Sequence, residues 1–327
     1  MDFGDRITDK NVKFQKVTIC PHSNIINSID LYKTLLLSAG EDDKIVLINL
    51  RDFSMVNSFY DCLNGVNFAK ILNEDLLLYY GHKTNKLILS KHDGSLLYMF
   101  EIVYENIQAL EVNLNVFKFF TVQKEKIYLF NVDPGNKSIN FEYVLSNDSY
   151  LAKFNSTGDK MITASCSQLT KRYEISLYVR RANQFKLLRK LDKTSKSKIT
   201  KVSFSSSDTK LIVMTQKTNG EKTSVVFIIS LIDDELIYKI CKAIDDLYLD
   251  FTVKNNSRLF VLTTHGNIFY YNIYSEDIYK RYVINKSNNS LISNGSIVCS
   301  DNNNLLVSNK SNFLIIYSLE DLTGRNV

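Results

Sequence analysis

The sequence has no tryptophan, 2 prolines and 11 glycines among its 327 residues. It also lacks any apolar run near the roughly 18 to 20 residues that a transmembrane helix needs, so we expect no membrane-spanning segment. The first residues, Met1 to Arg6, include two acids and are not followed by an apolar segment. We therefore expect no secretory signal and an intracellular protein. With 45% hydrophobic and 23% charged residues, the composition is that of a globular chain.

Cysteine and histidine are scarce and widely spaced. The cysteines are Cys20, Cys62, Cys166, Cys241 and Cys299, and the histidines are His22, His82, His92 and His265. The number of cysteines is odd, and no CxxC or HExxH spacing can be assembled from these residues. We therefore predict no metal site and no cofactor, and we interpret the cysteines as small buried hydrophobic residues.

The motifs of several enzyme classes are also missing. The sequence contains no GxSxG, GxxxxGK[ST] or GxGxxG pattern, and its glycines are too sparse to build a phosphate-binding loop. Adjacent acids occur at 41–43, 233–235 and 245–246, each in a predicted turn, where aspartate typically caps its own backbone. No pair of nucleophile and base can be proposed. The sequence thus predicts an interaction protein and not an enzyme.

Short apolar runs separated by polar turns recur along the chain, whereas the helical period does not. Seven similar runs begin at residues 45, 87, 127, 175, 225, 268 and 313, at steps of 40 to 50 residues. Each has two β-rich runs before it, and a more polar run follows, as at 185–191 and 278–282. Four strands in each unit of about 40 to 45 residues are typical of a β-propeller.

These repeats predict an all-β fold, a single seven-bladed WD-repeat-like β-propeller domain spanning residues 1–327. The seventh unit reaches residue 327 without a fourth strand, whereas a spare strand is predicted at about residues 13–19. We expect this N-terminal strand to complete the last blade and close the ring, because closure removes exposed strand edges.

Two segments carry a resemblance to the WD-repeat family. Ile127–Asn131 resembles the family's apolar-x-apolar-Trp-Asp pattern, and Gly81-His82 loosely resembles its Gly-His pair. The residues at the tryptophan position are Ile48, Ser90, Phe130, Tyr178, Ile228, Tyr271 and Ile316. The family's Asp-His-Ser-Trp hydrogen-bond network is therefore expected to be mostly missing. Apolar packing between blades must then supply the stability.

The order of segments is similar to the small WD-repeat subunit shared by COMPASS-type histone methyltransferases and the mRNA cleavage and transcription-termination phosphatase machinery. The similar segments are 87–100, 174–178 and 202–205. This resemblance implies a non-catalytic scaffold subunit in a nuclear chromatin-modifying or RNA 3′-end-processing complex. Its partners would be the protein subunits of that complex.

A rival resemblance is to the phosphoinositide-binding propellers of autophagy, carried by 126–131 and 161–165. That family's lipid site needs a Phe/Leu-Arg-Arg-Gly tetrad, and here Leu188-Arg189-Lys190-Leu191 has lost the second arginine and the glycine. This interpretation would place the chain on a membrane lipid. Another WD-repeat adaptor is a further alternative.

In a propeller, the loops between second and third strands and the loops that leave each unit emerge on one face. On that face, units four and five carry the basic residues Lys171, Arg172, Lys193, Lys196, Lys198, Lys217 and Lys222. The acids at 41–43 and 245–246 lie in other sectors of the same face. The basic residues predict a surface for an acidic peptide or a nucleic-acid backbone, and the other interpretation is a solvated lysine-rich surface.

Overall fold

The structure is a computed structural model that describes part of the 327-residue chain. The described residues are 10–11, 16–60, 65–81, 84–101, 107, 109–113, 118–123, 126–133, 135–145, 148–167, 169–182, 184–217, 223–233, 236–241, 246–254, 257–273, 281–285, 295–299 and 305–318. Every regular element among them is a β-strand. No helix long and apolar enough to cross a membrane occurs in this part of the chain.

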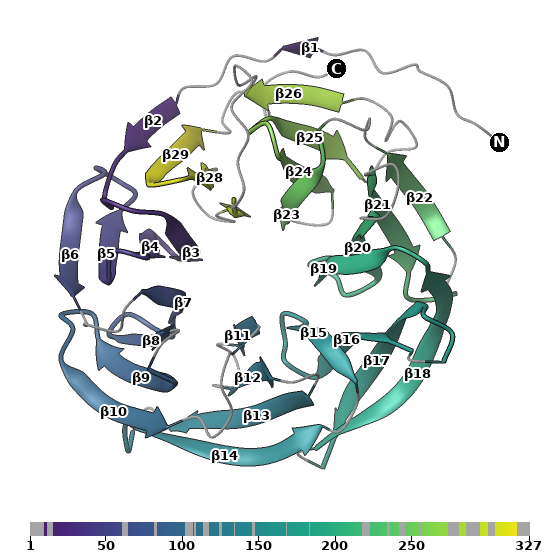
Figure 1. Cartoon of the computed structure of the whole chain (residues 1–327), viewed down its shortest axis with the longest axis horizontal. Helices are drawn as coiled ribbons and strands as arrows, with labels where there is room; N and C mark the ends of the chain where they lie inside the picture. The colour runs from purple at the N-terminus through teal and green to yellow at the C-terminus, as the bar shows by residue number, and fades with distance from the viewer. Residues whose placement is uncertain are drawn as a thin grey trace.

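The described strands form seven small sheets arranged around a central axis, as blades of a β-propeller (Figure 1). Blade 1 contains β3 (Ile26–Tyr32), β4 (Leu35–Gly40), β5 (Lys44–Asn49) and β6 (Met55–Tyr60). Blade 2 contains β7 (Val66–Ile71), β8 (Leu76–Gly81), β9 (Lys86–Lys91) and β10 (Leu96–Glu101). Blade 3 contains β11 (Ala109–Asn113), β12 (Lys118–Gln123), β13 (Lys126–Asp133) and β14 (Ser138–Leu145).

The remaining blades follow in chain order. Blade 4 contains β15 (Ser149–Phe154), β16 (Lys160–Cys166), β17 (Tyr173–Arg181) and β18 (Gln184–Ser195). Blade 5 contains β19 (Lys198–Phe204), β20 (Lys210–Lys217), β21 (Thr223–Ser230) and β22 (Leu236–Cys241). Blade 6 contains β23 (Tyr248–Lys254), β24 (Arg258–Thr263), β25 (Ile268–Asn272), β26 (Arg281–Asn285) and β1 (Lys10–Asn11). Blade 7 contains β27 (Ile297–Cys299), β28 (Leu305–Lys310), β29 (Phe313–Ser318) and β2 (Lys16–Ile19).

The predicted fold class, an all-β propeller, is confirmed, but the prediction of seven four-stranded units needs a correction. The regular four-stranded antiparallel sheet occurs six times in the described chain, not seven. The remaining sheet, blade 6, has five strands because β1 adds in parallel to the outer edge of β26. The repeat pattern did not predict β1, since a two-residue strand has no hydrophobic period of its own.

The N-terminal strand completes the last sheet as predicted. Strand β2 pairs antiparallel with β29, in a register that runs from Lys16 opposite Tyr317 to Ile19 opposite Leu314. Residues 13–15 of the predicted strand lie outside the described residues. Because β2 and β29 come from opposite ends of the chain, their pairing closes the ring and covers the edge that β29 would otherwise expose.

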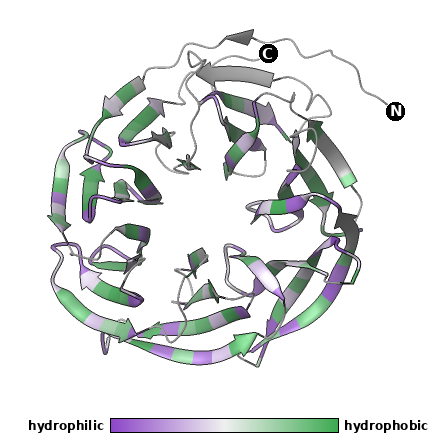
Figure 2. Cartoon of the chain, in the orientation of Figure 1, coloured by the Kyte–Doolittle hydropathy of each residue, from purple (hydrophilic) through white to green (hydrophobic). Residues whose placement is uncertain are grey.

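Apolar packing holds neighbouring blades together. Seven hydrophobic clusters are found among the described residues, and each combines buried side chains from two adjacent blades. Leu78 of blade 2 and Phe119 of blade 3 share one cluster, and Phe260 of blade 6 and Tyr317 of blade 7 share another. Hydrophobic residues occur in the strands of every blade (Figure 2), and every residue of β8 is buried. The expectation of stability from inter-blade packing fits this arrangement.

The outer strands are less uniformly polar than predicted. Strand β18 carries several basic residues as expected, but β6 has no charged residue, and its Met55, Val56 and Tyr60 side chains are exposed. Of the polar run predicted at 278–282, Arg281 and Tyr282 lie in β26, and residues 278–280 lie outside the described residues. An outer strand needs to bury only one of its faces, so the hydrophobic pattern in its sequence is weak.

Candidate interaction surface

The predicted basic residues lie at the ends of strands in blades 4 and 5. Strands β16 and β17 are joined by the turn 167–172, since Cys166 pairs with Tyr173 across it. Tyr173 also pairs with Ser195, the last residue of β18. Lys196 is the next residue after Ser195 and therefore lies beside the turn that contains Lys171 and Arg172.

Blade 5 contributes two further cations to the same region. Lys198 opens β19 and pairs with Gln216, and Lys217 follows at the end of β20. The exposed basic residues of this region are Lys171, Arg172, Lys196, Lys198 and Lys217, and we name them the basic sector. Residues from four separate strand ends are thus gathered on one face of two adjacent blades.

Two predicted members are not part of this set. Lys193 lies within β18 and not in the exit loop, because β18 continues to Ser195, and nothing in the structure describes its side chain. Lys222 lies outside the described residues. Lys198 also belongs to a strand, so the connection between blades 4 and 5 is shorter than predicted. Strands β18 and β19 are longer than predicted because their backbones continue to pair with neighbouring strands. Lysine side chains at a sheet edge do not prevent this pairing.

Aromatic rings lie beneath part of the basic sector. The rings of Tyr150 and Tyr173 meet edge to face with centroids 6.0 Å apart, and the Lys198 ammonium lies 5.7 Å from the Tyr150 ring centroid. The Tyr150 hydroxyl donates a hydrogen bond to the carbonyl of Ile199 at 2.9 Å. Burial raises the pKa of Tyr150, so its hydroxyl stays protonated. A cation over a neutral ring is a favourable contact.

Acids elsewhere on this face bind backbone amides and side chains of neighbouring loops. Asp42 accepts a hydrogen bond from the Ser23 amide at 2.8 Å, and Asp43 accepts one from the Gly65 amide. Asp246 accepts bonds from the His265 amide at 3.0 Å and the Asn267 side chain at 2.8 Å. The acids lie in loops as predicted, but in these contacts Asp42, Asp43 and Asp246 bind backbone amides 19 to 22 residues away rather than capping their own backbone.

A Ser-His-Asp arrangement, which the sequence analysis did not identify, lies in blade 1. His22 precedes β3, and its Nδ1 lies 2.8 Å from Oδ1 of Asp42, whereas its Nε2 lies 2.9 Å from Oγ of Ser38. Burial lowers the pKa of His22, although Asp42 opposes this shift. The neutral ring then donates a hydrogen bond from Nδ1 to the carboxylate and accepts one from the Ser38 hydroxyl at Nε2.

This arrangement is closed to a substrate. His22 is 3% exposed and Ser38 is 0% exposed. A Cβ atom at Gly40 would lie 2.9 Å from both Asp42 Oδ1 and His22 Nδ1, so the cluster is packed without spare room. The residues tie the entry segment of blade 1 to the turn between β4 and β5. Sequence reasoning missed this cluster, and the signal for it was that Ser38 and Asp42 follow His22 by 16 and 20 residues.

Inter-blade ion pairs line the inner strands, and the sequence analysis did not predict them. Asp30 on β3 pairs with Lys70 on β7 at 3.2 Å. Equivalent pairs join β11 to β15 and β19 to β23, through Glu111 with Lys153 and Lys201 with Asp250. Burial would lower the pKa of Lys70, but Asp30 and Glu111 raise it on balance. Burial would raise the pKa of Glu111, but Lys153 and Lys70 lower it on balance.

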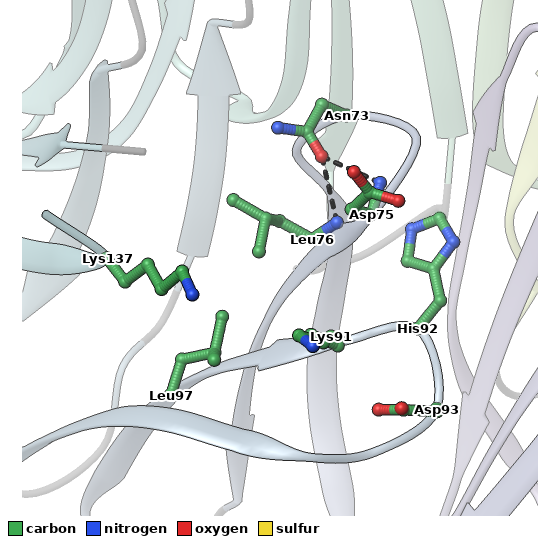
Figure 3. A pocket seen from close by; sticks show the side chains of 8 residues that line it. All are labelled: Asn73, Asp75, Leu76, Lys91, His92, Asp93, Leu97 and Lys137. Atoms are coloured by element: carbon green, nitrogen blue, oxygen red, sulfur yellow. Dashed lines mark hydrogen bonds between the residues drawn. The ribbon is translucent and has the colours of Figure 1, made fainter. Parts of the chain in front are cut away.

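A surface cavity of about 520 Å³ lies on the opposite face, between the turns of blades 2 and 3 (Figure 3). It is lined by Asn73, Asp75, Leu76, Lys91, His92, Asp93, Leu97 and Lys137. Asp93 accepts hydrogen bonds from the Ser95 amide, and Asn73 accepts them from the amides of Asp75 and Leu76. Two lysines and two aspartates balance one another, so the cavity does not select for one sign of charge.

The residues of the rival lipid tetrad make contacts within the fold. The Arg189 guanidinium donates a hydrogen bond to the Leu231 carbonyl of blade 5 at 2.5 Å. Lys190 pairs with Glu174 at 3.0 Å. Both basic side chains are thereby engaged by the protein, so these contacts lend no support to a lipid headgroup site.

Comparison with known proteins adds no family. No protein-family model matches the chain, and no curated protein sequence matches it either. Within the described residues, no group of three or more His, Cys, Asp or Glu side chains could hold a metal ion. The fold defines the chain as a β-propeller protein, and the basic sector is its candidate interaction surface.

Proposed function

We propose that this protein is a non-catalytic, WD-repeat-type scaffold subunit of a multisubunit assembly. A propeller offers a rigid disc with many exposed loops and is compatible with protein-protein interaction, although the fold alone does not define a function. The observation that carries the proposal is the basic sector, in which four strand ends place five exposed cations on one face. Such a surface attracts an acidic partner and accelerates its association.

The WD-repeat assignment is supported by blade 1. The His22, Ser38 and Asp42 contacts are similar to the family's Asp-His-Ser-Trp network, with Ile48 at the tryptophan position. The non-catalytic assignment is supported by the burial of the same cluster, since a buried serine cannot meet a substrate. The order of the repeats further supports a nuclear assembly that modifies chromatin or processes RNA 3′ ends.

Affinity purification of the tagged full chain from its native cells, followed by mass spectrometry, tests this proposal. We expect a stable set of protein subunits that includes a histone methyltransferase or a phosphatase of the termination machinery. A variant with Lys171, Lys196 and Lys217 changed to glutamate serves as the control for the basic sector. Recovery of the chain without partners, or turnover by the purified chain itself, would contradict the proposal.

A further inference from the structure

The turn between β16 and β17 carries an unusually exposed apolar side chain. Leu169 is 97% exposed, whereas turns are normally occupied by polar residues and glycine. Lys171 and Arg172 follow in the same turn and are exposed as well. Leu169 therefore lies in the same turn as two cations of the basic sector.

Hydrogen bonds hold this turn in one shape. The Ser167 amide donates to the Arg172 carbonyl at 2.9 Å, and the Lys171 amide donates to the Ser167 carbonyl at 2.9 Å. The Thr170 amide donates to the Ser167 hydroxyl at 3.3 Å. A side chain on a bonded turn loses less conformational entropy on binding than one on a mobile loop. The Leu169 side chain is thus held in position before a partner binds.

An exposed apolar side chain beside positive charges offers two elements of a binding interface. Leu169 in the turn and the half-buried Tyr173 at its base supply apolar surface, and Lys171 and Arg172 in the same turn supply positive charge. Burial of a leucine side chain against an apolar group of the partner is favourable. The surrounding lysines contribute mainly through long-range attraction, because exposed ion pairs are weak.

We propose that the Leu169 turn anchors an acidic peptide segment of a partner protein, in which a large apolar side chain lies between acidic residues. The inference rests on the proposed scaffold function and specifies the chemistry of its partner. Charge complementarity selects the acids, and Leu169 with Tyr173 receives the apolar side chain. A bilayer would need several apolar side chains to enter together, whereas one leucine beside two cations fits a single side-chain contact.

The chain offers a matched control for Leu169. Ile232 is 77% exposed and lies in the turn between β21 and β22. This turn is at the opposite end of β21 from the basic sector, so Ile232 lies on the other face of the disc. Leu169→Ala and Ile232→Ala remove similar exposed apolar surface. Neither change should alter thermal stability, because neither side chain is buried.

The test is a peptide-display selection against the purified full chain, followed by affinity measurements on the selected synthetic peptides. We expect enrichment of acidic peptides with a central apolar residue. Leu169→Ala should weaken their binding roughly tenfold, as expected from loss of about 1.4 kcal/mol, and Ile232→Ala should leave it unchanged. Reversal of Lys171, Lys196 and Lys217 to glutamate should also weaken binding.

The outcomes separate the anchor from the scaffold function. Peptides that depend on the lysines but bind Leu169→Ala normally would overturn the anchor and leave the basic sector as the docking surface. Peptides that depend on neither would overturn both. No enrichment, combined with Leu169-dependent binding to vesicles of phosphatidylcholine and phosphatidylserine, would replace the peptide partner with a membrane. No enrichment without vesicle binding would also overturn the peptide partner.

Discussion

The Nδ1 atom of His22 lies 2.8 Å from Oδ1 of Asp42, and this contact joins the segment that enters blade 1 to the turn between β4 and β5. Both side chains are nearly buried, so each provides the other with a hydrogen-bond partner in place of water. Ser38 completes the cluster from the middle of β4. A blade without tryptophan thereby retains a polar link between its entry and its second turn.

We expect His22→Ala to lower the free energy of unfolding by about 1–3 kcal/mol, because Asp42 and Ser38 lose their ring partner. The folded-state pKa of His22 is below its ordinary value of 6.5, so the unfolded chain binds the proton more readily. This contribution to stability is complete above pH 6.5 and is lost as the pH falls toward the folded-state pKa. Denaturant unfolding at pH 7.5 and pH 5 measures both effects. An unchanged pH dependence in the variant would argue against them.

The Asp30 and Lys70 pair should behave as a coupled unit. Lys70→Met leaves the Asp30 carboxylate without its cation, and Asp30→Asn leaves the Lys70 ammonium without its anion. We expect each single change to be destabilising, whereas the double variant should lose less than the sum of the two, by about 0.5–3 kcal/mol. A double-mutant cycle in chemical denaturation measures this coupling. Strict additivity would show that the pair is not a stabilising interaction.

Closure by β2 predicts a graded response to truncation. Deletion of residues 1–15 removes β1 but retains β2, whereas deletion of residues 1–19 removes both strands. The longer deletion should lower thermal stability more strongly, because it uncovers the β29 edge and removes Ile19 from the cluster between blades 7 and 1. Thermal unfolding followed by circular dichroism compares the two chains with the full protein. Equal melting temperatures would contradict closure by β2.

Charge reversal of Lys171, Lys196 and Lys217 should slow association with a partner without lowering the melting temperature. The three side chains are exposed and bury almost nothing. Their field acts at a distance, so the main change should be in the association rate. Raising the salt concentration should slow the unmodified protein similarly, since screening sets in over about 8–10 Å. Stopped-flow binding checks both effects, and rates that do not respond would assign these lysines to a solvated surface.

Repeat spacing was sufficient to predict the propeller and its closing strand. Apolar runs such as 45–49 and 127–131 are long enough to show a strand pattern, because both faces of a third strand are buried between blades. The two-residue β1 and the uncharged outer strand β6 were not predictable in this way. Their positions depend on backbone pairing at the rim, where the sequence pattern is weak.

The sequence by itself determined the strand-rich fold, the order of the repeats and the region where basic residues are dense. Only the tertiary structure decided which residues meet: His22 with Ser38 and Asp42, and Asp30 with Lys70. It also showed that Leu169 stands exposed in the same turn as Lys171 and Arg172. The physical reason is that periodicity records which face of a strand is buried, whereas contacts between turns and blades depend on how separate segments are placed in the closed ring.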